Sequence, residues 1–262
     1  MSITTEQQLE VRNVLTHSLR KKFEKHNPEP GAMPFHTRLL GKDRLALYSF
    51  IHSLNTNFGT SMFEPVAVII GKGTFHSAES QQNAGTMISS EAHSVIQKIM
   101  DELSVSTRKP NKLQELEEIR SVCQKGRLNT VRLTRVDLKL VAHNGEVYLI
   151  DIKTAKPNAG SFKEFKRTLL EWSAASLAID PNLTVNTLIA IPYNPYAPKP
   201  YERWTMMGML DTGNEVRVAE SFWDFLGGAG TYDALLDVFE DVGISMRDEI
   251  DDYFAKFKRN ND

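Results

Sequence analysis

The chain has 262 residues, of which 41% are hydrophobic and 24% are charged, and its formal net charge is -2. This length and composition are ordinary for a globular protein with one full core. A lone cysteine excludes a disulfide framework, and no apolar run reaches membrane-spanning length. The polar N-terminus shows no signal peptide, so the sequence predicts a soluble intracellular protein.

The charges are distributed unevenly along the chain. Residues 11–44 hold eight Lys or Arg against three acidic residues, and residues 122–172 hold ten against five. Residues 211–255 reverse the balance, with two basic residues against twelve acidic ones. Such a chain can present a cationic face to a polyanion while its total charge stays near zero. On charge alone, the simpler explanation is that these residues line solvated faces.

Helical spacing dominates the first half of the chain. Apolar residues that recur every three to four positions predict helices over residues 6–25, 43–54 and 59–70. Two more helices are expected to follow the N-cap residues Ser89 and Asn111. The second of these helices is predicted to bury Leu113 on its inward side and to end at Gly126.

From residue 128 the apolar period changes from 3.6 to 2, which indicates strands. The expected strands cover residues 128–141, 146–154, 184–191 and 203–210. Ser161 and Glu164 form a capping box that opens a long helix to about residue 178. Two short helices, capped near Thr231 and Ser245, are expected in the last part of the chain.

These elements predict an α/β fold with a mixed central sheet that carries a β-hairpin and is flanked by helices. Residues 1–262 are expected to form a single domain. Within it, about residues 1–55 form a helical N-terminal part, and about residues 220–262 form an acidic helical C-terminal part.

The segment YLIDIKT, residues 148–154, places charged side chains in an otherwise apolar strand. Side chains alternate across a strand, so Asp151 and Lys153 share one face. A two-residue hairpin turn would place Leu138 opposite Asp151, whereas a three-residue loop would place Asp137 there. The longer loop needs a left-handed residue at its third position, which suits Gly145. We therefore expect Asp137 to face Asp151.

Two facing carboxylates repel each other unless one is protonated or a cation lies between them. Hard oxygen ligands with open coordination positions suit Mg²⁺, which also takes substrate phosphate oxygens. Lys153, on the same face, could hold or help deprotonate an attacking water. Together these groups match the needs of phosphodiester hydrolysis, namely a nucleophile and charge compensation for the transition state.

The spacing of these residues resembles the signature of the PD-(D/E)XK nucleases. Asp137 is followed by thirteen residues and then by Asp151-Ile152-Lys153, with Val136 where the motif has proline. The resemblance implies a restriction-endonuclease-like core in which Asp137 and Asp151 bind Mg²⁺ and Lys153 is catalytic.

A third carboxylate joins the metal site in that superfamily, on the first core helix. The segment GTSMFEPVAVI resembles this helix and implies that Glu64 is both a metal ligand and a catalytic residue. Glu91, in SSEAHSVI, is the alternative.

Longer segments are similar to the TdeIII-type family of type II restriction endonucleases, over most of the chain from about residue 55. They are DIKTAKPNAGSFKEFKRTLLEW, IPYNPYAPKPYERW and FWDFLGGAGTYDALLDVFEDVG. This resemblance implies Mg²⁺-dependent cleavage of double-stranded DNA at a short palindrome of the GGNCC kind, which leaves 5′-phosphates. It also implies a homodimer, a companion DNA methyltransferase acting on the same site, and the cytoplasm of a prokaryote.

Two segments are candidates for DNA contact. The helix after the hairpin groups three basic residues on one face, which suits either solvent or phosphates. The loop PYNPYAPKPYERW holds four prolines that stiffen it, so it could present Arg203 to guanine or simply connect two elements. The residues predicted to contact DNA are Lys156, Asn158, Lys163, Lys166, Arg167, Tyr193, Asn194, Lys199 and Arg203.

Two alternatives remain open on the sequence alone. A repair or recombination nuclease of the same fold would use the same carboxylates without recognising a palindrome. A DNA-binding protein without catalysis would use Asp137 and Asp151 only as partners for neighbouring basic residues, which are Arg135, Lys139 and Lys153.

Overall fold

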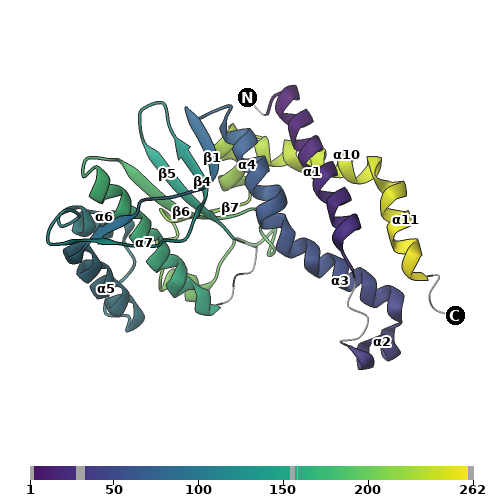
Figure 1. The fold of residues 1–262 in the computed structure, drawn as a ribbon, viewed down its shortest axis with the longest axis horizontal. Helices are drawn as coiled ribbons and strands as arrows, with labels where there is room; N and C mark the ends of the chain where they lie inside the picture. Colours follow the sequence, from purple (N-terminus) through teal and green to yellow (C-terminus); the bar gives the residue numbers. More distant parts are fainter. Residues whose placement is uncertain (1–2, 28–32, 154–156, 158, 259–262) are drawn as a thin grey trace.

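A mixed five-stranded sheet lies at the centre of the protein, with helices on both faces (Figure 1). The computed structural model describes residues 3–27, 33–153, 157 and 159–258. The strand order is β1-β4-β5-β6-β7, in which β1, β4 and β5 are antiparallel neighbours and β5, β6 and β7 are parallel. The strands are β1 (Ser77–Gln82), β4 (Val136–Val141), β5 (Val147–Ile152), β6 (Val185–Ile191) and β7 (Val216–Val218). The α/β class and the mixed sheet are confirmed.

The hairpin between β4 and β5 has the three-residue loop that the sequence predicts. Val141 pairs with Val147, and the Gly145 N–H donates to the Ala142 carbonyl at 2.9 Å. Gly145 has φ +87°, in the left-handed region that a residue with a side chain rarely adopts. The pairing of Leu138 with Ile150, continued by one position, sets Asp137 across from Asp151.

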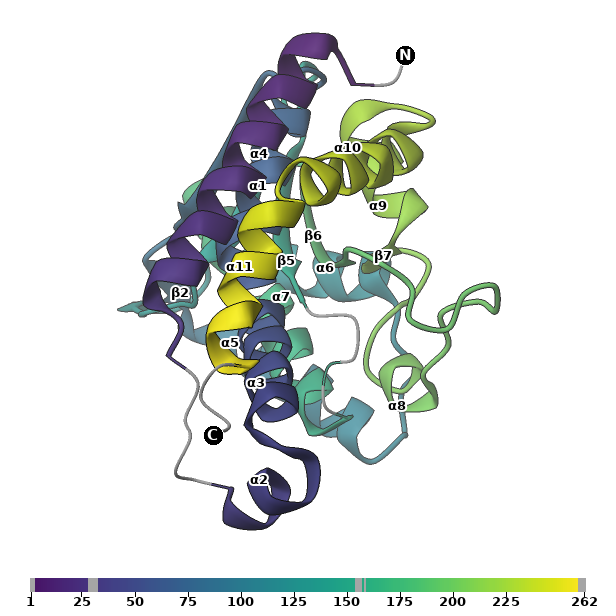
Figure 2. The ribbon, with the colours of Figure 1, turned by 90° about the vertical axis from the view of Figure 1, so that its right-hand side faces the viewer.

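Helices from both ends of the chain cover one face of the sheet. They pack on Leu138, Leu140 and Ile150, which are fully buried. These helices are α1 (Thr5–Lys25), α4 (Glu64–Gly71), α9 (Glu220–Gly227) and α10 (Thr231–Ser245). α3 (Lys42–Asn57) leads into α4 through one π-helical segment, η1 (Phe58–Phe63). The last helix, α11 (Arg247–Lys258), packs against α3 (Figure 2).

The opposite face of the sheet is covered by α7 (Phe162–Ile179), which connects the parallel strands β5 and β6. Trp172 of α7 is fully buried in this second core and donates its indole N–H to the Thr134 carbonyl at 3.0 Å. α5 (Ser90–Ser104) and α6 (Lys112–Arg120) pack outside α7, and the side chains of Ser89 and Asn111 cap them as predicted. None of the described helices combines the length and apolar character that crossing a membrane requires.

Several predicted elements differ from the structure. Residues 128–141 form two strands, because β3 (Leu128–Thr130) pairs with β2 (Met87–Ser89) in a separate two-stranded sheet. Residues 203–210 contain the short helix α8 (Trp204–Met207) and no strand. The predicted helix over residues 59–70 begins with the π-helical η1. Residues 220–258 form three helices, where the sequence predicts two.

Two side-chain predictions are also wrong. Ser161 does not cap α7, because it lies in a short 3₁₀ helix with helical φ and ψ and its hydroxyl makes no capping bond. A capping side chain needs an extended backbone to turn back toward the helix. Leu113 is 70% exposed, because α6 turns its other side toward α7 and buries Ile119.

Candidate active site

Three carboxylates and a lysine lie together where α4, β4 and β5 meet. Asp137 is the second residue of β4, Asp151 precedes the last residue of β5, and Glu64 is the first residue of α4. Glu64 and Asp151 are only 4% and 3% exposed. Lys153 Nζ lies 2.7 Å from Asp151 Oδ1 and 4.9 Å from the centre of the Phe165 ring. The sequence-predicted carboxylates are therefore brought together.

Gln81 of β1 joins the carboxylates, and the sequence contains no signal for it. Its Nε2 donates to Glu64 Oε2 at 2.8 Å and to Asp137 Oδ1 at 3.3 Å. Gln81 has φ +55°, a conformation that is costly for a residue with a side chain. The Arg135 guanidinium donates to its carbonyl at 3.1 Å and helps to hold this backbone.

Burial dominates the electrostatics of the site. Removal from water raises the pKa of Asp151 to about 7, and this effect outweighs the nearby Lys153 ammonium, which lowers it. Asp137 adds to the rise in the pKa of Asp151. Burial likewise raises the pKa of Glu64, opposed by the Gln81 hydrogen bond and by Lys153. A positive charge placed next to either carboxyl group would therefore stabilise its ionised form.

The donor chemistry of these residues fits a hard divalent cation. Across the described ranges, no three His, Cys, Asp or Glu side chains are arranged to hold a metal ion as they stand. Gln81 and Lys153 satisfy the carboxylate oxygens instead, and the Ile152 N–H donates to Asp137 Oδ2 at 2.9 Å. Carboxylate oxygens from three adjoining elements match the ligand preference of Mg²⁺. Glu64, Asp137 and Asp151 are therefore the residues that would hold such an ion.

Glu91 lies away from this site. It is an exposed residue in the first turn of α5, which packs on α7 on the other side of the sheet from α4. Its side chain lies next to Gly126. Of the two acidic residues that the sequence offers upstream of the hairpin, the geometry places Glu64 with Asp137 and Asp151.

The predicted grouping of Lys166 with Lys163 and Arg167 on one exposed face is wrong. Lys166 is fully buried, and its Nζ lies 2.5 Å from Glu115 Oε2 and 2.7 Å from Glu215 Oε2. It follows that Lys166 holds a structural ion pair inside the protein and presents no charge to DNA.

The ion pairs of Lys166 belong to a larger buried network. Lys112 Nζ lies 3.6 Å from Glu215 Oε1 and also donates to the hydroxyl of Thr187 in β6. Two lysines and two glutamates thus balance each other's charge between α6, α7 and the residues before β7. The apolar pattern of the sequence does not predict that α6, α7 and Glu215 meet, and this network joins them.

The remaining predicted DNA contacts differ in their surroundings. Lys163 is exposed at the start of α7, and Arg167 donates to Gln97 Oε1 at 2.9 Å. Lys199 is exposed and Tyr193 is 44% exposed in the proline-rich loop. Lys156 and Asn158 lie outside the described residues.

Asn194 closes the proline-rich loop on itself. Its side-chain amide donates to the Lys199 carbonyl at 2.7 Å and accepts from the Tyr196 N–H at 2.9 Å. Arg203 donates to the Pro157 carbonyl at 2.5 Å and lies over the Phe162 ring, 5.5 Å from its centre. Arg203 is therefore fixed beside the segment that follows Lys153.

A family model described as a type II restriction endonuclease, HinfI, matches residues 3–243. The chain belongs to the HinfI family of type II restriction endonucleases. It is therefore a site-specific deoxyribonuclease. The resemblance to type II restriction endonucleases is confirmed, while the narrower TdeIII type is not, because the matching model is that of HinfI.

Curated relatives of this HinfI-family chain are also named as type II restriction enzymes. HgiCII and HgiEI of Herpetosiphon aurantiacus are each 27% identical to the chain, over 223 and 221 residues. Both alignments cover 83% of the chain, and they cover 80% and 79% of the two relatives. MjaII of Methanocaldococcus jannaschii is 28% identical over 209 residues, which is 76% of the chain and 55% of that protein.

Replacement of Asp151 by asparagine should abolish cleavage and stabilise the fold at high pH. The pKa of Asp151 is raised from its ordinary value near 4 to about 7 in the folded protein. The free energy of unfolding of the wild type therefore falls as pH rises from about 4 to about 7, because the buried carboxyl group must ionise. We expect Asp151→Asn to raise the free energy of unfolding by about 1–3 kcal/mol at pH 8 and by less at pH 5. Urea denaturation at both pH values measures this difference. Asp237→Asn, on the exposed side of α10, is the control and should show no such pH dependence; an equal response of both variants would contradict the assignment.

Replacement of Lys166 by methionine should destabilise the protein strongly. The change leaves Glu115 and Glu215 buried with too little positive charge, which typically costs about 3–5 kcal/mol. Lys163→Met, at an exposed position on the same helix, should change the free energy of unfolding by less than about 0.5 kcal/mol. Urea unfolding of both variants tests the difference. A Lys166→Met protein of wild-type stability with weakened DNA binding would return Lys166 to the DNA surface.

Proposed function

We propose that this type II restriction endonuclease cuts both strands of DNA at a short palindrome, uses Mg²⁺, and leaves 5′-phosphates. The observation that carries the proposal is the convergence of Glu64, Asp137 and Asp151 with Lys153 in a chain of this family. Family membership decides against the two alternatives, a repair nuclease and a DNA-binding protein without catalysis.

Each residue of the site has a distinct part in the proposed reaction. Asp137, Asp151 and Glu64 would bind the cation through their oxygens, and the burial of Asp151 and Glu64 excludes water that would weaken this attraction. A bound Mg²⁺ supplies charge compensation for the developing phosphorane-like transition state. Lys153, whose side chain is 29% exposed, orients the attacking water beside Asp151. Gln81 holds Glu64 and Asp137 in place until the ion binds.

Basic residues around the site are the proposed DNA contacts. Lys163 and Lys199 are exposed and would meet phosphates. Arg203, held by Pro157 and Phe162, is the proposed reader of a guanine edge. A sequence of the GGNCC kind is the first candidate for the recognition site, and a DNA methyltransferase acting on that sequence would protect the host's own DNA.

A digest of plasmid DNA with Mg²⁺ tests this function. A discrete set of fragments is expected, and sequencing of their ends gives the recognition site and the cut stagger. Direct ligation of the fragments, without prior treatment by a kinase, would support 5′-phosphate ends. A smear would indicate cleavage without sequence specificity, and DNA left intact would contradict the proposal.

The choice between Glu64 and Glu91 has its own test. Glu64→Gln should lower the cleavage rate at least about 100-fold and shift the Mg²⁺ requirement upward, because it removes a buried oxygen ligand beside Asp137. Glu91→Gln, at an exposed position on α5, should cut at nearly the wild-type rate. A Mg²⁺ titration of both variants measures the effect. An inactive Glu91 variant beside an active Glu64 variant would transfer the role.

Exposed apolar side chains on α2 (Pro34–Leu40) and α3 support the proposed homodimer. Phe35 and Leu39 of α2 are 84% and 82% exposed, and Tyr48 and Ile51 of α3 are 58% and 48% exposed. Exposed apolar groups gathered in this way favour a protein partner. A second copy of the chain fits, because a palindrome with twofold symmetry is cut on both strands by two sites related by the same symmetry.

The dimer surface can be tested by its molecular mass in solution. Leu39→Lys combined with Ile51→Lys should convert a dimer into monomers, because two charges would be buried without partners. Leu113→Lys, at another exposed leucine but on α6, is the matched control and should remain dimeric. Analytical ultracentrifugation distinguishes the two outcomes. A double variant that stays dimeric would place the interface elsewhere.

A further inference from the structure

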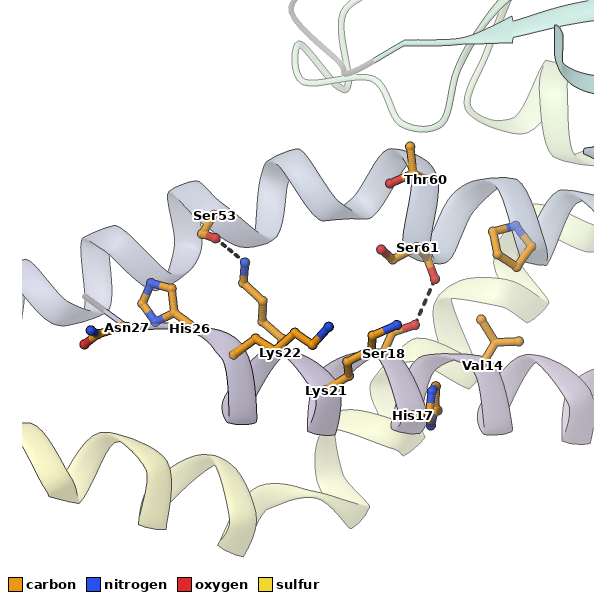
Figure 3. A pocket seen from close by; sticks show the side chains of 12 residues that line it. Val14, His17, Ser18, Lys21, Lys22, His26, Asn27, Ser53, Thr60 and Ser61 are labelled. Carbon is orange, nitrogen blue, oxygen red and sulfur yellow. Dashed lines mark hydrogen bonds between the residues drawn. The ribbon is translucent and has the colours of Figure 1, made fainter. Parts of the chain in front are cut away.

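A cavity of about 620 Å³ lies between α1 and the segment that runs from α3 through η1 (Figure 3). Lysines and histidines of α1 and the residues after it line one side, and hydroxyl groups of Ser53, Thr60 and Ser61 line the other. None of the described lining residues is acidic. The cavity therefore offers cations and hydroxyl donors, which are groups that bind an anion.

Lys22 is a buried lysine in the wall of this cavity. It is 9% exposed, and its ammonium donates to the hydroxyl of Ser53 (Figure 3). Burial lowers the pKa of Lys22, and within the described part of the chain no carboxylate opposes that effect. A buried cation is costly unless a negative charge neutralises it, so this cavity has the chemistry to favour a bound anion.

Other basic residues of α1 do have carboxylate partners within the chain. Arg12 pairs with Asp241 of α10, and Arg20 Nη2 lies 2.7 Å from Glu249 of α11. The acidic C-terminal helices thus neutralise one side of α1, whereas the described residues that line the cavity beside Lys21 and Lys22 include no carboxylate. The dipole at the C-terminus of α1 favours lysines in its last turn, but it does not favour burying one under α3.

The cavity adjoins the active-site segment of the chain. Its lining includes Ser61 and Pro65, which flank Glu64 at the start of α4. The Ser18 hydroxyl donates to the Ser61 carbonyl at 2.8 Å and ties α1 to this segment (Figure 3). An anion bound in this cavity would therefore lie beside the segment that leads into Glu64.

We propose that this cavity binds a phosphate group of the DNA backbone outside the bond that is cut. Lys22 and Lys21 provide the positive charge, and Ser53 and Thr60 provide hydroxyl donors. The inference rests on the proposed function for its DNA substrate, whereas the phosphate chemistry rests on the cavity alone. Inorganic phosphate presents the same chemistry in a free form, so both sources must be compared.

The test measures DNA affinity against salt concentration for Lys22→Met and Lys21→Met. Binding to a duplex that contains the cleavage site is measured in Ca²⁺, so that the DNA is not cut. Each variant should bind at least about 5-fold more weakly near 0.1 M salt, and the slope of log K against log salt should fall by about 0.9 per lost phosphate contact. Lys125→Met, at an exposed lysine after α6, is the control and should retain the wild-type slope.

A second arm uses inorganic phosphate and does not depend on DNA. Phosphate should raise the melting temperature of the wild type and of Lys125→Met more than that of Lys22→Met. Lys22→Met should remain folded, because methionine removes a buried charge and keeps most of the packing volume.

The outcomes separate this inference from the proposed function. A reduced slope together with the phosphate effect supports a DNA phosphate site. The phosphate effect with an unchanged slope would overturn the DNA source and assign the cavity to free phosphate. Unchanged values in both arms, in an enzyme that still cuts DNA, would overturn the inference alone. A wild type that neither binds nor cuts DNA would overturn the proposed function, and the phosphate arm would still decide the chemistry of the cavity.

Discussion

The pairing of β4 with β5 sets two carboxylates opposite each other, and the proposed active site depends on that pairing. Asp137 and Asp151 repel each other there, and burial raises the pKa of Asp151 to about 7. The surrounding structure compensates with the Lys153 ammonium, the Gln81 amide and the Ile152 N–H. A divalent cation would replace part of this compensation, so the burial of Asp151, which is unfavourable in the free protein, suits the proposed metal site.

The sheet that carries this hairpin is held on its other side by a buried ionic network. Lys166 lies between Glu115 and Glu215, and it ties α7 to α6 and to the residues before β7. α7 begins directly after the segment that follows Lys153, and Arg203 contacts that segment at Pro157. The network therefore holds in place the helix that follows β5, and its buried charges stabilise this arrangement and are not available to DNA.

The charged residues of the chain lie in three different surroundings. The acidic helices α10 and α11 pair with Arg12 and Arg20 of α1, which explains much of the contrast between the two ends of the sequence. The buried network uses lysines within the core. Lys21 and Lys22 line the cavity at η1, where the described residues include no acidic lining, and they are the proposed anion-binding part of the basic N-terminal region.

The sequence by itself determined the features that arise from neighbouring residues. Alternation and the left-handed Gly145 set the hairpin register, and with it the meeting of Asp137 and Asp151, because both signals act within a few residues. Only the tertiary structure decided the rest. β1 is a polar strand that forms because β4 offers it hydrogen bonds. Its sequence has no alternation of apolar residues, so neither the strand nor the role of Gln81 could be predicted. The burial of Lys166 likewise depends on Glu115 and Glu215, which lie about fifty positions away in the sequence, a separation at which local patterns carry no information.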